Sequence, residues 1–411
     1  MNKDFKILRE LATEKRALLS DYDSESKIKF WKDINDLKIT RPPVFIYQVP
    51  WSEFSDIKEL SLQCEDELLQ TIETKLRKEI YEINHFPGDM VYFNKIELKA
   101  VIYDTNFGLE NKEDIIRSGH INSHHFTPVI TQLEDIFKMK ESIVEYDIDE
   151  TQRRLDLLNE IFFGICDVEL VGLKGLWFTP WDYLIYRTGV TDAMIDLIER
   201  PDFVNSYVSR YVDLSLIRME RYKELGLWSS NNDNTGVGSG GYGYVSDLEE
   251  PPKPNLNVPT EKIWGCGNAQ IFSEVSPDMH WEFSLRHEMR WLKKFGMNYY
   301  GCCEQLHLKI DILSKIPNLR KISMSPWANL DIARESIDER YVMSIKPTPA
   351  AVAMQPFDEN VIRAEINSQL DKTAGNPTEF ILKDISTVKG EPKRLDAWDR
   401  VVREEIDKRF S

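Results

Sequence analysis

Residues 297–304, MNYYGCCE, form an apolar run that ends in two cysteines and a glutamate. Similar runs, each closed by polar residues and followed by helical spacing, occur on both sides of it. They are KIWGCGNAQIFSEVSP (262–277), RKISMSPW (320–327), RYVMSIKP (340–347) and EFILKDIS (379–386). Such alternation predicts a parallel sheet with crossover helices. Four or five successive units favour an α/β fold of the (β/α)8 TIM-barrel type, with its site at the carboxyl ends of the strands.

The N-terminal part of the chain predicts a helical preface to this barrel. Residues 1–40 carry helical spacing and many charges, and Pro42 and Pro43 then precede the apolar run VFIYQV. We therefore expect a helical N-terminal extension over 1–40 and a TIM-barrel catalytic domain over 41–411. Within that domain, helical spacing covers 56–84, and HFPGDMVYF (85–93) is a strand candidate.

The middle of the chain is less uniform. Residues 97–150 show only short β-like pieces, whereas 150–226 again alternate between strand and helix patterns. Residues 231–259 are rich in Gly, Asn and Pro, which predicts a long loop that is either functional or a plain surface excursion. Neither GxGxxG nor a P-loop opens a helix, which argues against an open doubly wound sheet.

Composition narrows the classes of function. The formal net charge is −17, from 69 acidic and 52 basic residues, so the surface is expected to repel nucleic acid and anionic lipid. The N-terminal segment is charged throughout, and no apolar run is long enough to span a bilayer, which predicts a cytoplasmic protein that binds no membrane. Five cysteines, an odd number, indicate reduced thiols rather than a disulfide framework.

Cys302, Cys303 and Glu304 are the sharpest chemical feature of the sequence. Thiolates are soft ligands that suit zinc, and an adjacent carboxylate can complete a metal site or act as a base. Alternatively, one thiol packs inside the barrel and Glu304 caps the next helix. We predict a zinc site formed by these three residues.

Polar residues at the other strand ends are expected to share the same rim. Lys346, Lys383, Asp384 and Glu304 are candidate catalytic groups, because a desolvated lysine can neutralise an anion or become nucleophilic; either lysine could instead pair with a neighbouring acid. Candidate substrate-binding residues are Trp51, His85, Asn268, Gln270, Glu274, Tyr300, Ser325 and Trp327.

The segments WGCGNAQIFSEVSP, YYGCCEQL, NLRKISMSPW, YVMSIKPTPA and ILKDIST resemble the uroporphyrinogen decarboxylase superfamily of TIM barrels, which includes corrinoid-dependent methyltransferases. The likeness is best over 260–400 and is closest to a uroporphyrinogen decarboxylase-like branch found in anaerobic bacteria. It implies methyl transfer between a small methylated substrate and a corrinoid held by a partner protein, with zinc as a Lewis acid if zinc binds.

The chain departs from this superfamily at two motifs. True decarboxylases carry an arginine-bearing segment after the first strand, but PPVFIYQVPWSEF (42–54) contains no arginine, so uroporphyrinogen is not the expected substrate. The zinc methyltransferases have His-x-Cys after one strand and a late cysteine after the last. Here only Cys302 matches, since Tyr300 stands at the histidine position and ILKDIS lacks a cysteine.

Three hypotheses about function follow. The first is the corrinoid-dependent methyltransferase, whose partners would be a corrinoid-binding protein and a small-molecule methyl donor. The second is a metal-free decarboxylase or lyase acting on a small or tetrapyrrole-like acid, with Lys346, Lys383 or Asp384 holding the substrate. The third is a non-catalytic barrel that binds a corrinoid or tetrapyrrole. A homodimer is the expected assembly, because two-fold dimers are common among soluble enzymes.

Overall fold

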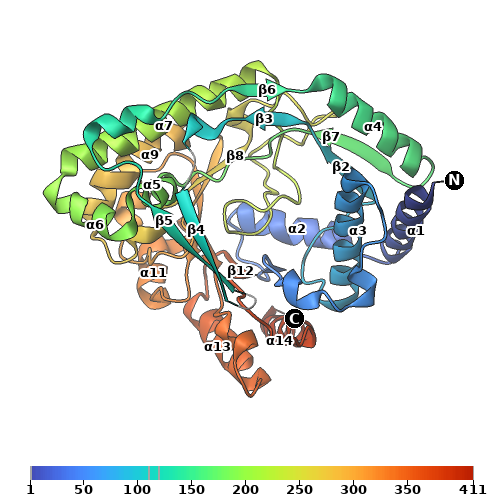
Figure 1. The fold of residues 1–411 in the computed structure, drawn as a ribbon. Coiled ribbons are helices and arrows are strands. Elements are labelled where there is room, and N and C mark those ends of the chain that lie inside the picture. Colours follow the sequence, from blue (N-terminus) through green and yellow to red (C-terminus); the bar gives the residue numbers. More distant parts are fainter. Residues whose placement is uncertain (1, 110–111, 119–120, 411) are drawn as a thin grey trace.

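A curled, six-stranded parallel sheet forms the centre of the computed structural model, which describes residues 2–109, 112–118 and 121–410, with 112–118 and 121–126 as backbone only (Figure 1). The strand order is β1-β12-β11-β10-β9-β8. Their bounds are β1 (Val44–Ile46), β8 (Trp264–Gly267), β9 (Met297–Tyr300), β10 (Leu319–Met324), β11 (Val342–Ile345) and β12 (Thr378–Leu382). The five strands of the C-terminal third lie where the sequence predicts them.

A second parallel pair, β2 (Lys95–Lys99) and β7 (Asp167–Val171), lies beside this sheet. A parallel β-bridge between Leu173, just after β7, and Trp228 places one further chain segment beside this pair of strands. Within the residues that the structure describes, β1 and β2 share no ladder of hydrogen bonds. The prediction of a TIM barrel therefore holds in its coarser form, an α/β fold with a curled parallel sheet, while a closed eight-stranded barrel is not formed.

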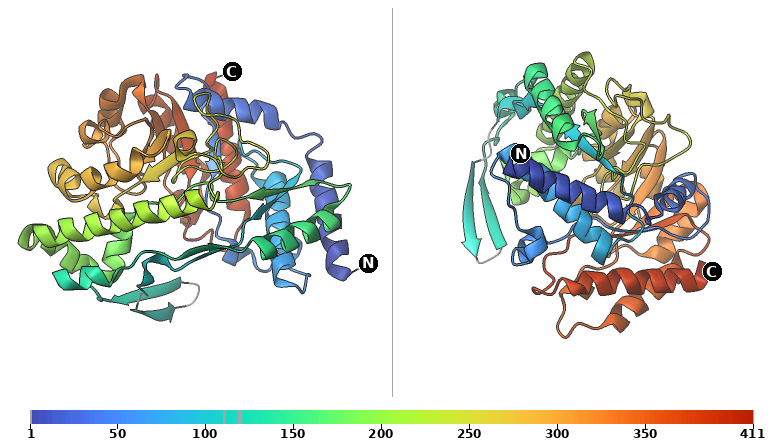
Figure 2. Two further views of the ribbon diagram at one scale, coloured as in Figure 1. Left: turned by 90° about the horizontal axis from the view of Figure 1, so that it is seen from above. Right: turned by 90° about the vertical axis from the view of Figure 1, so that its right-hand side faces the viewer.

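Helices cover the outside of the strands, as expected for crossover connections (Figures 1 and 2). Their bounds are α1 (Lys3–Leu18), α2 (Ser24–Asn35), α3 (Glu67–His85), α4 (Ile148–Phe162), α5 (Pro180–Thr188), α6 (Val190–Glu199), α7 (Pro201–Glu224), α8 (Pro277–His280), α9 (Arg286–Leu292), α10 (Ile310–Leu313), α11 (Leu330–Ile337), α12 (Ala350–Ala353), α13 (Glu359–Lys372) and α14 (Lys393–Phe410). No helix among the described residues has the length and apolar character needed to cross a bilayer.

The segment 1–40 contains two helices, α1 and α2, and both contribute to the core. The apolar face of α1 packs with α3, α4, β2 and β7 in one cluster. Trp31 of α2 is fully buried in the main cluster, and its indole N–H donates to the carbonyl of Asp89 at 2.6 Å. Thus α1 packs against the β2–β7 pair, and α2 packs against the curled sheet.

Two sequence predictions differ from the structure, and one stretch that the sequence left unassigned is now placed. The strand expected within 85–93 is absent, because Gly88 turns there with φ +48° and β2 begins only at Lys95. The helix expected over 305–316 is reduced to the short α10. The unassigned stretch 97–150 contains the end of β2, an antiparallel pair formed by β3 (Ile102–Asp104) and β6 (Val144–Tyr146), and a projecting hairpin of β4 (Lys112–Ser118) and β5 (Ile121–Thr127) (Figure 2).

The glycine-rich segment 231–245 is no surface excursion, since most of it is buried inside the curled sheet. Gly241 lies so close to Trp31 that an added Cβ would come within 2.0 Å of the indole ring. Its N–H donates to Glu379 of β12 at 3.0 Å, and Tyr242 packs on Phe45 of β1. Glycine therefore allows this backbone to approach aromatic rings that a side chain would exclude.

Candidate active site

Cys302, Cys303, Lys383 and Asp384 form a cluster, the rim cluster, where β9 and β12 end. Two strands separate β9 from β12 in the sheet, but the sheet curls enough for the residues that follow them to meet. The ammonium of Lys383 donates to Cys302 Sγ at 3.1 Å and to Cys303 Sγ at 3.6 Å. The two sulfurs are 3.5 Å apart, and Lys383 Nζ lies 3.0 Å from Asp384 Oδ2. Of the polar residues that the sequence predicts at strand ends, the structure brings these four together.

The electrostatics of the rim cluster favour one thiolate. The hydrogen bond from Cys303, aided by the charge of Lys383 and opposed by burial, lowers the pKa of Cys302 to about 7. The same hydrogen bond and burial raise the pKa of Cys303, whose thiol contacts Asp384 Oδ2 at 3.4 Å. Although burial opposes it, the charge of Cys302 and its hydrogen bond with Lys383 raise the pKa of Lys383. The cluster is therefore an ammonium–thiolate pair with a neutral thiol beside it.

Two side chains hold the backbone around the rim cluster by accepting hydrogen bonds from it: the amide oxygen of Gln48 and the carboxylate of Glu304. Asp384 has φ +57°, and its N–H donates to Gln48 Oε1 at 2.8 Å, which fixes the chain after β12 against the end of β1. Glu304 is fully buried and accepts from the N–H of Cys302 at 2.8 Å and of Ala269 at 3.2 Å. Glu304 thus joins the ends of β8 and β9.

The predicted zinc ligands do not fit a metal ion in this arrangement. Both carboxylate oxygens of Glu304 accept backbone N–H groups, and Lys383 already contacts both sulfurs. Among the residues whose side chains the structure describes, no group of three or more His, Cys, Asp or Glu is placed to hold a metal. Zinc at Cys302, Cys303 and Glu304 stays a prediction for metal analysis.

Lys346 lies in a buried polar layer beneath the rim. Its ammonium donates to Ser344 Oγ at 2.6 Å and to Tyr299 Oη at 3.1 Å, and burial lowers its pKa to about 7. Next to it, Lys321 and Glu379 form an ion pair at 2.8 Å with both side chains fully buried. Because Lys346 is 2% exposed, a substrate at the rim does not reach it without movement of this layer.

The candidate substrate-binding residues do not converge on one pocket. Asn268 and Ser325 are buried, with Asn268 Nδ2 and Ser325 Oγ lacking hydrogen-bond partners, while Trp327 is 72% exposed. The remaining five contact protein groups: Gln270 binds Asp182 of α5, Glu274 binds Gln305, Tyr300 binds His280, Trp51 packs on Phe54, and His85 stacks on Tyr81. These contacts give each of the five a structural role.

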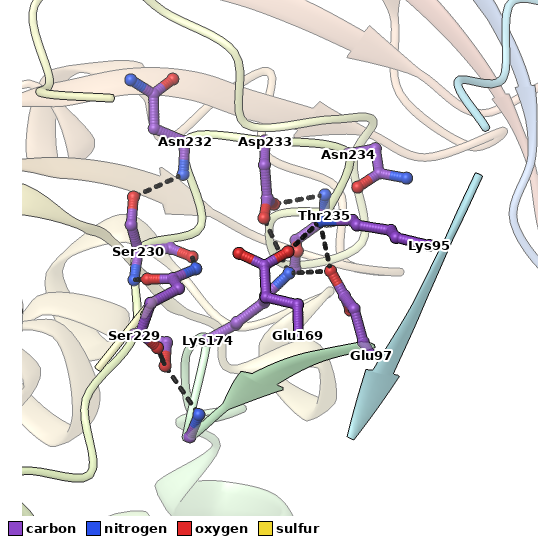
Figure 3. A network of polar contacts seen from close by, with 12 residues as sticks. Lys95, Glu97, Glu169, Lys174, Ser229, Ser230, Asn232, Asp233, Asn234 and Thr235 are labelled. Atoms are coloured by element: carbon purple, nitrogen blue, oxygen red, sulfur yellow. Dashed lines mark hydrogen bonds and ion pairs between the residues drawn. The ribbon is translucent and has the colours of Figure 1, made fainter. Parts of the chain in front are cut away.

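Sequence reasoning missed a network of charges on β2 and β7 (Figure 3). Lys95 pairs with Glu169 at 2.7 Å and with Glu97 at 3.0 Å. Lys174 pairs with Glu97 and with Asp233 of the glycine-rich segment, each at 2.7 Å. The sequence signal for this network was the alternation of charged and apolar residues in KIELK (95–99). The same alternation is typical of a strand that has one face in solvent, so it did not by itself indicate a buried network.

Comparisons with known proteins support the fold. No family model and no curated protein sequence matches the chain. Among solved structures, the chain is similar to a methyltransferase from Methanosarcina mazei, with a TM-score of 0.52 and 12% identity, over 92% of this chain and 98% of that one. At 12% identity, the likeness concerns the arrangement of strands and helices, which the two chains share over almost their whole lengths.

Proposed function

We propose that the chain is a methyltransferase that moves a methyl group between a small methylated molecule and a corrinoid carried by a partner protein. The observation that carries the proposal is the Lys383–Cys302 pair at the rim, 3.1 Å apart, in a fold similar to that of a protein named as a methyltransferase. Lysine, thiolate and carboxylate at the carboxyl ends of strands are the residues that an α/β barrel uses for chemistry.

Lys383 is the group that would assist the departure of the methyl group. When a methyl–oxygen bond breaks, its electrons stay on the oxygen, and this developing anion requires a positive charge or a proton. Lys383 carries the charge, and its ammonium or the neutral thiol of Cys303 can supply the proton. Asp384, 3.0 Å from Lys383 Nζ, would keep the ammonium oriented. The corrinoid would supply the methyl-accepting metal, and no step here depends on zinc.

The test is methyl transfer to free reduced cobalamin, a substitute for the partner-bound corrinoid, from a panel of methanol, methylamines, methyl ethers and methyl thioethers. We expect the absorbance of reduced cobalamin to be lost when the protein and one of these donors are both present, and not when either is left out. Lys383→Met should lower the rate about a hundredfold or more, because it removes both charge and proton. Cys166→Ser, far from the rim cluster, is the matched control and should leave the rate unchanged.

The same assay separates the alternatives. Carbon dioxide release from a carboxylic acid without cobalamin would replace the methyltransferase proposal by the decarboxylase or lyase. Activity that a chelator abolishes and zinc restores would bring zinc back into the mechanism. No transfer from any donor, to free cobalamin or to a corrinoid-loaded partner, would contradict the proposal.

A further inference from the structure

A cavity of about 500 Å³ opens between β2, β7, β8 and the glycine-rich segment. We call it the Lys99 cavity. Its lining includes Tyr47, Glu97, Lys99, Lys174, Trp177 and Cys266. Its size lies within the range of small-molecule sites. It occupies the side of the fold where β2 and β7 stand apart from the six-stranded sheet.

The charges on one wall of this cavity come from the inner face of β2. Ile96 and Leu98 pack in the apolar cluster with α1 and α3, so the alternate residues Glu97 and Lys99 point to the opposite face. Despite burial, the charges of Lys174 and Lys95 lower the pKa of Glu97 to about 2. Glu97 is therefore ionised and fully paired, and Lys174 is committed to Glu97 and Asp233 (Figure 3).

Lys99 is the cation of this cavity that has no counter-charge. It is exposed, and within the part of the chain that the structure describes it forms no hydrogen bond or ion pair. The neighbouring lysines on the same wall are both paired with carboxylates. The cavity thus presents one unpaired ammonium, that of Lys99, and its lining also includes Trp177, which is 45% exposed.

Tyr47 links the cavity to the rim cluster. It lines the cavity, and its hydroxyl donates to the carbonyl of Gly238 at 3.4 Å. Burial raises the pKa of Tyr47; the charges of Cys266 and Cys302 raise it further, and the charge of Lys383 opposes them. The N–H of Tyr47 donates to the carbonyl of Leu382 at 2.8 Å, and Leu382 directly precedes Lys383. A molecule in the cavity that contacts Tyr47 therefore lies near the rim cluster.

We propose that the Lys99 cavity is the substrate pocket of the rim site and that it selects a small monocarboxylate, with the carboxylate paired to Lys99 and the apolar body against Trp177. This inference rests on the proposed function. A single unpaired cation matches one negative charge, while the ionised Glu97 beside it disfavours a dianion. The reactive end of the molecule would then point toward Tyr47 and the rim cluster.

The test compares carboxylates with their neutral amides by titration calorimetry on the full chain. The probes are hexanoate with hexanamide, benzoate with benzamide, and 2-naphthoate with 2-naphthamide. At least one carboxylate should bind more tightly than its amide. Lys99→Met should weaken that carboxylate about tenfold or more, and Lys99→Arg should retain it, because a charge-assisted bond is lost only in the first variant. Lys293→Met, an exposed lysine at the end of α9, is the matched control and should bind like the unaltered protein.

Two results would overturn the pocket. One is that no carboxylate binds more tightly than its amide, and the other is that Lys99→Met binds the carboxylate as well as Lys293→Met does. These failures are distinct from failure of the proposed function. Methyl transfer that is indifferent to Lys99→Met removes the pocket and keeps the reaction, whereas Lys99-dependent binding without any methyl transfer keeps the pocket and removes the reaction.

Discussion

Cys302 is the residue on which the chemistry of the rim depends, and its ionisation can be measured directly. With its pKa near 7 through Cys303 and Lys383, about half of it is thiolate at neutral pH. We expect the rate of its alkylation by iodoacetamide, followed by peptide mass spectrometry, to rise with a midpoint near pH 7. In Lys383→Met the midpoint should move upward, making the reaction at pH 7 roughly tenfold slower.

Cys166 provides the internal control for this experiment, because burial raises its pKa and it lies far from the rim, at the start of β7. Its alkylation should increase only at higher pH and should not respond to Lys383→Met. A Cys302 midpoint as high as that of Cys166, or one that Lys383→Met leaves in place, would contradict the ammonium–thiolate pair.

At the scale of elements, the close packing of the glycine-rich segment against α2 leads to a prediction about stability. Gly241→Ala would place a methyl group 2.0 Å from the Trp31 ring, so either the segment or α2 must move. We expect a loss of about 2–4 kcal/mol in the free energy of unfolding, measured with denaturant. Gly267→Ala on β8, whose nearest neighbour would be 3.5 Å away, should cost less than about 1 kcal/mol. Equal, small losses in both variants would mean that the segment is not packed against α2.

The same segment marks where sequence reasoning reached its limit. The strands of the C-terminal third were predictable because each is a short, largely apolar run followed by polar or thiol side chains. The rim cluster followed, since parallel strands end at one edge. The segment 231–245 was not predictable, because glycines that permit close packing look like glycines that permit flexible turns. Glu97 and Lys95 were missed for a related reason, as their partners Lys174 and Glu169 lie far along the chain.

At the scale of the whole molecule, stability at alkaline pH is limited by a buried carboxyl group. Glu288 of α9 is fully buried beside Ser284 and Tyr300, and burial raises its pKa to about 8. In the unfolded chain its pKa returns to about 4.3. The folded state therefore keeps Glu288 protonated where the unfolded state releases the proton, so its contribution to stability is complete below about pH 4.3 and is lost as the pH rises toward 8.

This linkage gives a prediction for the unfolding of the entire chain. Between pH 5 and pH 8 the free energy of unfolding of Glu288→Gln should fall by about 2–4 kcal/mol less than that of the unaltered protein, because glutamine cannot ionise. Denaturant unfolding at both pH values measures the difference. Glu335→Gln, an exposed change on α11, should reproduce the pH response of the unaltered protein. If Glu288→Gln and Glu335→Gln respond alike, Glu288 is ionised in the fold and burial of this carboxyl does not limit stability.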